Sequence, residues 1–279
     1  MQFSIAHLGP AGTYAEAAAT AYVRYLVETK GLKSSLYPYP SIAQTLWAVA
    51  RGEVDLGVVP VENSIEGSVS MTLDTLWQID TLQIQQALVL PISHALISLA
   101  KNPQEIEVVY SHPQALAQCQ EWLNQNLPQV RQIATNSTTE ALQHLDQETT
   151  AGAIASERAA SLYQLPILAH PINDYPDNCT RFWVVSLQPS PGGNHTSLAF
   201  SVLENKPGIL VKPLQVFAEQ GINMSRIESR PTKRLLGDYL FFIDLEANTC
   251  DQSVKLALAE LATYTKTLKI FGSYSIVNR

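Results

Sequence analysis

The 279-residue sequence predicts an α/β protein made of two unequal regions, and three observations support that prediction. Short apolar runs alternate with helical patterns up to about residue 188, which is typical of α/β folds with mainly parallel sheets. Residues 82–99 instead resemble two consecutive strands with no helix between them. Residues 187–194 hold two prolines and two glycines, which mark a linker before a second region.

The elements of the first region follow from its local apolar patterns. Short apolar runs predict strands at residues 3–9, 55–61, 107–112, 151–156 and 181–187. Apolar residues at helical spacing predict helices at residues 14–28, 42–51, 113–126 and 138–145. A chain that leaves one sheet at residues 82–99, builds a second sheet and returns forms two lobes. Small ligands usually bind in the cleft between such bodies.

The second region has the element order of a ferredoxin-like domain. Its patterns predict strands at residues 195–203, 222–231, 238–247 and 268–276, with helices at residues 208–221 and 253–265. This βαββαβ order defines the ferredoxin-like plan. The plan serves many functions, so the order alone does not establish one.

Composition and charge exclude several classes of partner. Residues 1–188 hold 8 Lys+Arg and 17 Asp+Glu, a net charge of −9, while residues 189–279 hold 10 and 8, a net of +2. With no basic stripe, nucleic acid is not an expected partner. No long uninterrupted apolar run or signal-peptide pattern is present, so we expect a cytoplasmic protein with no membrane partner. The three cysteines, Cys119, Cys179 and Cys250, have no disulfide or metal-ligand spacing, and we expect no metal or cofactor.

Four connections between a strand and a helix carry side chains suited to holding a small anion. Helix N-termini present free N–H groups there, and hydroxyl and amide side chains add donors. The candidates are Thr13 in the first connection, Glu62, Asn63 and Ser64 in the second, Ser111 and Gln114 in the third, and Ser137 and Thr138 in the fourth.

The simplest interpretation of Thr13 and Ser137 is that they cap helices. No G-x-S-x-G pattern of a hydrolase and no glycine-rich phosphate loop is present. The residues therefore indicate a receptor for a small anion and leave the reaction open.

Thr180 and Arg181 stand side by side where a polar segment leads into an apolar strand. Threonine favours strands and arginine often pairs at sheet edges, so the two residues alone do not indicate catalysis. On a regular strand Thr180 and Phe182 share one face, whereas Arg181 points to the other.

Seven segments in order resemble the prephenate dehydratase family with its C-terminal ACT domain. They are GPAGTYAEAAA, VVPVENSIEGSV, SHPQALAQC, NSTTEA, NCTRFWVV, NKPGIL and GINMSRIESRP, and together they span nearly the whole chain. The resemblance implies a catalytic domain over residues 1–188 with a two-lobed fold like type 2 periplasmic binding proteins, followed by an ACT domain over residues 195–279. It also implies conversion of prephenate to phenylpyruvate in the cleft between the lobes, for L-phenylalanine biosynthesis.

The resemblance assigns roles to individual residues. Thr180 is expected to donate a hydrogen bond to the departing hydroxyl, Arg181 to bind a carboxylate and Phe182 to pack against the ring. Substrate-binding candidates are Asn178, Thr13, Glu62, Asn63, Ser64, Ser111, Gln114, Ser137 and Thr138, with Glu62 also a candidate relay acid.

By the same resemblance, the C-terminal domain binds L-phenylalanine as an inhibitor and pairs into a homodimer or homotetramer. The effector candidates are Asn205, Pro207, Gly208, Ile209, Leu210, Asn223, Glu228, Ser229, Arg230 and Pro231. Two positions depart from the family pattern: Ala15 replaces a hydroxyl residue, and Ile209 replaces a smaller alanine. Two alternatives stay open, namely an arogenate dehydratase and a non-catalytic amino-acid sensor.

Overall fold

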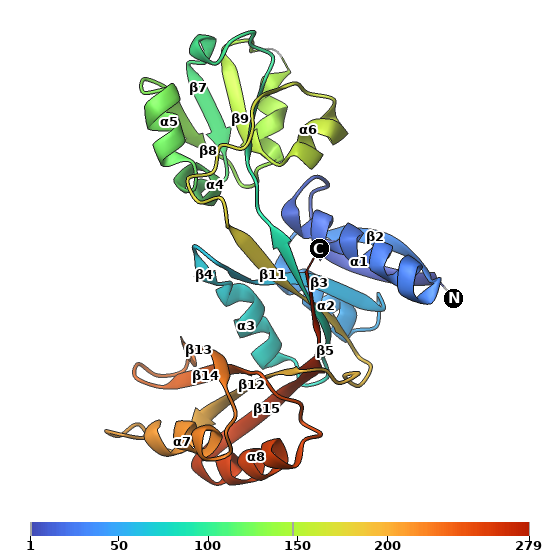
Figure 1. Cartoon of the computed structure of the whole chain (residues 1–279), viewed down its shortest axis with the longest axis vertical. Coiled ribbons are helices and arrows are strands. Elements are labelled where there is room, and N and C mark those ends of the chain that lie inside the picture. The colour runs from blue at the N-terminus through green and yellow to red at the C-terminus, as the bar shows by residue number, and fades with distance from the viewer. Residues whose placement is uncertain (1, 147, 279) are drawn as a thin grey trace.

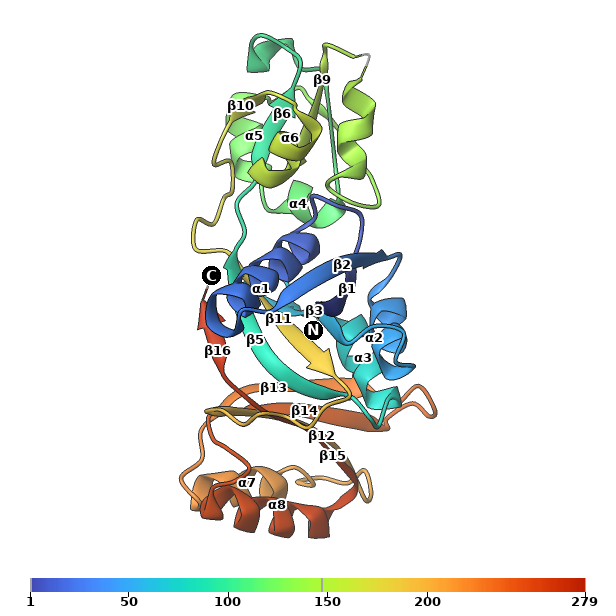
Figure 2. The same ribbon diagram turned by 90° about the vertical axis from the view of Figure 1, so that its right-hand side faces the viewer.

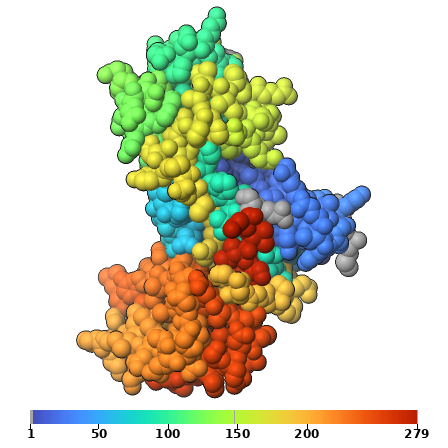
Figure 3. Space-filling model, in the orientation of Figure 1, coloured from blue at the N-terminus to red at the C-terminus, as the bar shows by residue number. Residues whose placement is uncertain are grey.

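The computed structural model describes residues 2–146 and 148–278 as three bodies along one long axis (Figures 1 and 3). Lobe 1 lies in the middle, lobe 2 at one end and the C-terminal domain at the other. The C-terminal strand, red in Figure 3, returns to the surface of lobe 1.

Lobe 1 is built on a seven-stranded sheet with the order β16-β5-β11-β3-β1-β2 and with β4 paired to β3. The strands are β1 (Gln2–Leu8), β2 (Lys33–Tyr39), β3 (Leu56–Asn63), β4 (Gly67–Ser68), β5 (Gln83–Pro91), β11 (Cys179–Ser186) and β16 (Ile276–Asn278). One face packs against α1 (Tyr14–Lys30), and the other against α2 (Ile42–Ala50) and α3 (Ser70–Gln78). Thr13 caps the start of α1 by accepting the N–H of Glu16.

Lobe 2 has a five-stranded sheet with the order β10-β6-β9-β7-β8. Its strands are β6 (Ala95–Ser98), β7 (Val108–Ser111), β8 (Arg131–Ala134), β9 (Ala151–Ala155) and β10 (Ile167–Ala169). Its helices are α4 (Pro113–Ala117), α5 (Gln120–Asn126) and α6 (Glu157–Tyr163), with short 3-10 helices η1 (Pro103–Glu105) and η2 (Glu140–Leu145). The single helix predicted at residues 113–126 is wrong, because Cys119 leaves the helical backbone conformation and starts a new helix.

The chain crosses between the lobes twice, after β5 and again before β11, and the predicted two-lobed fold is confirmed. The two strands predicted within residues 82–99 are β5 in lobe 1 and β6 in lobe 2. Both sheets are mixed rather than mainly parallel as predicted. The reason is that strands next to the crossovers run against their neighbours: β11 is antiparallel to β3 and β5, and β6 is antiparallel to β9 and β10.

The C-terminal domain confirms the predicted βαββαβ order. Its elements are β12 (His195–Val202), α7 (Val211–Glu219), β13 (Met224–Pro231), β14 (Tyr239–Leu245), α8 (Gln252–Tyr264) and β15 (Thr265–Tyr274), in a sheet ordered β13-β14-β12-β15. Both helices lie on the face away from lobe 1 (Figure 2). The other face shares one apolar cluster with lobe 1, in which Phe242 and Phe271 join Leu46 and Trp183. Strand β16 then pairs with β5, so the last described residues of the region predicted as 195–279 belong to the sheet of lobe 1.

Candidate active site between the lobes

Asn63, the last residue of β3, is the centre of a buried hydrogen-bond cluster. Its side-chain Oδ1 accepts the backbone N–H groups of Ile65 (3.0 Å) and Glu66 (3.1 Å), which fixes the orientation of the amide. Its Nδ2 then faces Oδ1 of Asn178 and Oγ1 of Thr180, each at 2.9 Å. The register that pairs Asn63 of β3 with Thr180 of β11 brings these distant residues together.

The cluster continues into lobe 2 through residues that the sequence analysis did not select. Asn178 donates through Nδ2 to Oε1 of Gln118 (2.9 Å), and Nε2 of His94 lies 3.0 Å from the same oxygen. Nδ1 of His94 lies 3.1 Å from the hydroxyl of Tyr14. Two signals in the sequence could have indicated these residues. Gln118 and Tyr14 lie within the segments that resemble the family, and His94 interrupts the most apolar stretch.

Two groups in this cluster keep unused hydrogen-bond donors. Thr180 is 8% exposed, and its oxygen accepts from Asn63, but its hydroxyl donates no hydrogen bond within the described chain. The Nε2 amide nitrogen of Gln118 is buried and likewise lacks a partner among the described residues. Unsatisfied buried donors are rare and are often found where a ligand or water binds.

The structure does not bring Arg181 and Phe182 to Thr180. Phe182 is buried in the apolar cluster beneath α1, on the same side of β11 as Thr180 but within the core. Arg181 points the opposite way, with Nη2 3.4 Å from Glu62 and Nη1 3.2 Å from Asp244 of the C-terminal domain. This is the alternation of faces expected for a regular strand. The catalytic assignments of Arg181 and Phe182 stay predictions.

Asp244 is the centre of a second polar cluster, which joins lobe 1 to the C-terminal domain. The carboxylate is buried and binds Arg226 through Nε (2.8 Å), Ser197 through its hydroxyl (2.6 Å) and Arg181. Arg226 also donates to Ser68 of lobe 1 (3.2 Å). Burial opposes the charge of Arg226, but the neighbouring Asp244 outweighs it and raises the arginine pKa.

The remaining substrate-binding candidates lie in different settings. Ser64 donates to Asn178 Oδ1 (3.3 Å) and belongs to the site. Thr13 caps α1, and Ser137 accepts the N–H of Glu140 (3.0 Å), which are the capping roles that the sequence suggested. Ser111 is fully buried, with its hydroxyl on the carbonyl of Ile154. The side chains of Gln114 and Thr138 are half-buried.

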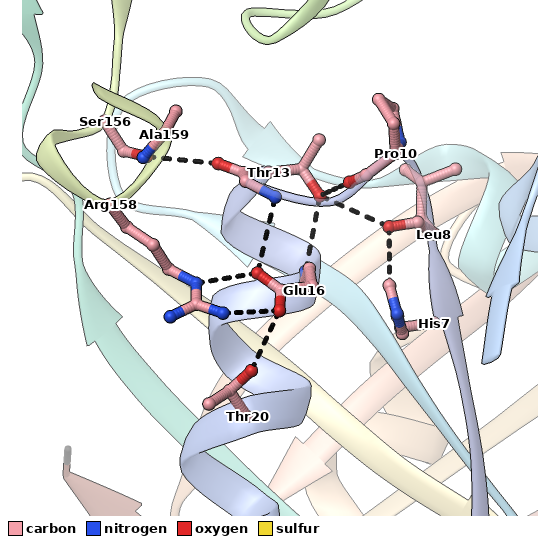
Figure 4. Close-up of polar contacts among 10 residues, drawn as sticks. His7, Leu8, Pro10, Thr13, Glu16, Thr20, Ser156, Arg158 and Ala159 are labelled. Carbon is pink, nitrogen blue, oxygen red and sulfur yellow. Dashed lines mark hydrogen bonds and ion pairs between the residues drawn. The ribbon is translucent and has the colours of Figure 1, made fainter. Parts of the chain in front are cut away.

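The two lobes also contact each other directly, beside α1. Arg158 of α6 binds both carboxylate oxygens of Glu16, at 2.7 and 2.5 Å (Figure 4). Ser156 donates to the carbonyl of Gly12 (3.1 Å). Partial burial alone would raise the pKa of the Glu16 carboxyl, but the hydrogen bonds and charge of Arg158 outweigh it and hold the pKa below its usual range.

The predicted effector segments lie apart from this site. Pro207, Gly208 and Ile209 line a pocket of about 350 Å³ together with residues that include Lys212 and Tyr264. Among the other effector candidates, three side chains donate hydrogen bonds. Asn205 donates to the carbonyl of Gly237, and Asn223 donates to Glu246. Arg230 donates to Asp74 of α3 in lobe 1. Leu210, Glu228, Ser229 and Pro231 complete the two segments, which follow β12 and form most of β13.

Two general features concern the described residues, 2–146 and 148–278. No helix among them is long and apolar enough to cross a membrane, and they contain no His, Cys, Asp and Glu grouping that could hold a metal ion. Cys119 is buried, and burial raises the pKa of its thiol.

Models of two protein families match the chain. The family described as prephenate dehydratase matches residues 5–190, and the ACT domain family matches residues 196–262. The chain is 42% identical over 276 residues to the bifunctional chorismate mutase/prephenate dehydratase of Aquifex aeolicus, covering 98% of this chain and 74% of the relative. It is 36% identical over 280 residues to the prephenate dehydratase of Lactococcus lactis subsp. cremoris, covering 98% and 97%.

Two solved structures share the fold over nearly the whole chain. A prephenate dehydratase from Arthrobacter aurescens in complex with L-Phe has a TM-score of 0.85 and 33% identity, covering 98% of this chain and 90% of that one. A structure described as GqqA, a novel type of quorum-quenching acylase, has a TM-score of 0.82 and 27% identity, covering 98% of both chains.

Proposed function

The chain belongs to the prephenate dehydratase family, and from that premise we propose that the cluster of Asn63, Asn178 and Thr180 is its reaction centre. The activity is the decarboxylating dehydration of prephenate to phenylpyruvate, regulated by L-phenylalanine. In this reaction the ring carboxylate leaves as carbon dioxide and its bonding electrons enter the ring. The C4 hydroxyl leaves at the same time and becomes water by gaining one proton.

The unused donor of Thr180 is the observation that carries the proposal. Asn63 occupies a lone pair of the Thr180 oxygen, so the hydroxyl hydrogen is the group left to face substrate. A donor placed at a leaving oxygen stabilises the charge that develops there, and removal of one such donor typically costs about 10²–10³ in kcat. The alcohol is too weak an acid to supply the proton itself, so water or a relay acid completes the step.

Binding of the substrate dianion needs donors around this centre. The unpaired amide nitrogen of Gln118 is the best placed, because it belongs to the cluster and has no partner among the described residues. Ser64 stays a proposed contributor whose hydroxyl already donates to Asn178. Thr13, Ser111, Gln114, Ser137 and Thr138 stay proposed contributors from the surrounding turns. Arg181 binds Glu62 and Asp244 on the face of β11 opposite Thr180, so it reaches a substrate carboxylate beside Thr180 only if its side chain moves.

The test is the initial rate of phenylpyruvate formation from prephenate, with an enzyme-free control because prephenate decays unaided. We expect Thr180→Ala to lose about 10²–10³ in kcat with little change in KM. Thr180→Ser keeps the hydroxyl and serves as the matched control. Parent-like turnover by Thr180→Ala would remove this residue from the mechanism.

Regulation is proposed to act through the segments at residues 205–210 and 223–231. The pocket beside Gly208 supplies polar backbone at a turn, which suits an amino acid effector.

Strand β13 forms the edge of its sheet, which supports pairing of two copies there as a homodimer or homotetramer. Sedimentation with and without L-phenylalanine tests the assembly. We propose a cytoplasmic location, to be checked by cell fractionation.

Two alternatives, one other reaction and one non-catalytic role, can be tested with the same preparation. Arogenate dehydratase activity would appear as phenylalanine formed from arogenate at a higher kcat/KM than phenylpyruvate from prephenate. Failure of both substrates would leave the sensor alternative.

Amide hydrolysis is a candidate because one contact favours it and a similar structure is described as an acylase. Ser93 Oγ lies 2.7 Å from Nε2 of His170, whose Nδ1 lies 3.2 Å from Glu157. This is a nucleophile–base–acid arrangement, although Ser93 is not on a nucleophile elbow. Fluorophosphonate labelling of the parent but not of Ser93→Ala would support it, and no labelling would reject it.

A further inference from the structure

His94 lies on the first crossover between the lobes and contacts lobe 1, lobe 2 and the second crossover. Its ring is 2% exposed and lies between Tyr14 of α1 in lobe 1 and Gln118 of lobe 2. Its backbone N–H donates to Oδ1 of Asn173 (2.6 Å), which lies on the second crossover.

The direction of each hydrogen bond in the cluster can be assigned from the backbone outward. The N–H groups of Ile65 and Glu66 require Asn63 to present its Oδ1 to them, so its Nδ2 faces Asn178. Asn178 must then accept through Oδ1, which leaves its Nδ2 to donate to Oε1 of Gln118. If the Gln118 amide were flipped, its Nε2 would face Nδ2 of Asn178, and two donors would meet. Oε1 therefore also faces His94, and an oxygen there can only accept.

The imidazole must therefore carry its hydrogen on Nε2. Burial lowers the pKa of His94, although the hydrogen bond to Gln118 opposes this, and burial raises the pKa of the Tyr14 phenol. Both groups are then neutral at pH 7. Nδ1 is left as an acceptor 3.1 Å from the Tyr14 hydroxyl, whose hydrogen is donated to the carbonyl of Ser93 (2.6 Å).

We propose that His94 is a positioning residue for the dehydration: it holds Gln118, and through Gln118 it holds Asn178 against the Asn63 amide that orients the Thr180 hydroxyl. The inference rests on the proposed role of Thr180. Its physical basis is that the Gln118 oxygen has two hydrogen-bond partners, Nδ2 of Asn178 and Nε2 of His94, which together hold the side chain in place. Without the Nε2 donor, Asn178 is the one hydrogen-bond partner left to the Gln118 side chain within the described residues, so the positions of both amides are less well fixed.

The test compares His94→Leu, which removes the donor, with His94→Gln, which keeps an N–H near the place of Nε2. We expect His94→Leu to lower kcat about tenfold or more with KM nearly unchanged, since one buried hydrogen bond is at stake. His94→Gln should restore most of the loss, a rescue that a purely structural role would not give. His7→Leu, a change at a buried histidine outside the cluster, should match the parent.

A double substitution distinguishes this inference from the proposed function. If His94 acts through Thr180, His94→Leu should have no further effect on kcat in the Thr180→Ala background. An additive loss, or parent-like kcat in His94→Leu while Thr180→Ala is inactive, overturns the role of His94. Full activity of Thr180→Ala overturns the reaction centre itself. If His94→Leu does not fold, His94→Phe takes its place, since it keeps a ring and removes the donor: a lower kcat at unchanged KM supports the inference, and the parent kcat overturns it.

Discussion

Replacing Asp244 by asparagine should uncouple the C-terminal domain from lobe 1. Asp244 is 1% exposed and provides the buried negative charge for Arg226 and Arg181. Removing one partner of a buried ion pair typically costs about 3–5 kcal/mol. Asparagine keeps the shape and one acceptor, so we expect the lower end, about 3 kcal/mol. For a chain of this size that corresponds to a fall in Tm of about 6–12 °C.

The same substitution should weaken feedback by L-phenylalanine. Arg226 lies on β13, the strand that carries the effector candidates, while Arg181 lies on β11 beside Thr180, and Asp244 binds both arginines. Effector binding that moves β13 would therefore be transmitted to β11 through this carboxylate. Because allosteric coupling is typically 1–3 kcal/mol, we expect the half-inhibiting concentration to rise about fivefold or more.

The assay is the L-phenylalanine titration of phenylpyruvate formation, together with thermal unfolding of the same samples. Glu260→Gln is the matched control, since Glu260 is exposed on α8 and makes no contact with lobe 1 in the described structure. The reasoning would be refuted by Asp244→Asn protein with the parental Tm and inhibition curve. A lower Tm with parental inhibition would retain the ion pair as a structural contact and reject it as the route of coupling.

Three further predictions concern the effector loop and the contacts of Glu16 and Gly12 between the lobes. Glu16→Gln should lower stability at pH 7 by about 1–2 kcal/mol, because Arg158 is part-exposed and solvent screens the pair. The folded pKa of Glu16 lies below its unfolded value, so this contribution is present above about pH 4.3 and is lost as pH falls through the folded pKa; denaturant unfolding at acid pH should show no difference between parent and Glu16→Gln. Gly12→Ala should cost about 1–3 kcal/mol in the same measurement, because Gly12 has φ +87° and an added Cβ would lie 2.9 Å from Thr139; an unchanged midpoint would contradict this turn geometry. Ile209→Ala should bind L-phenylalanine more tightly by calorimetry if the larger side chain narrows the loop pocket, and equal affinity would reject that idea.

Several features of this protein follow from local patterns in the sequence. The alternation of apolar runs gave the α/β class, and the uninterrupted strands at residues 82–99 indicated the crossing between two lobes. The element order after the Pro/Gly linker gave the ferredoxin-like domain. Even the separation of Arg181 from Thr180 was predictable, because successive side chains on a strand point to opposite faces.

The identity of the partners depended on long-range packing. Thr180 meets Asn63, 117 residues away, because antiparallel pairing of β3 and β11 places the two residues opposite each other. Arg181 meets Asp244 because a separate domain packs on lobe 1. Gln118 and His94 join the site only after the chain has crossed between the lobes and folded back. Local periodicity determines which face of an element a side chain occupies. Only the tertiary structure decides which side chain lies opposite, because that contact depends on how whole elements pack against one another.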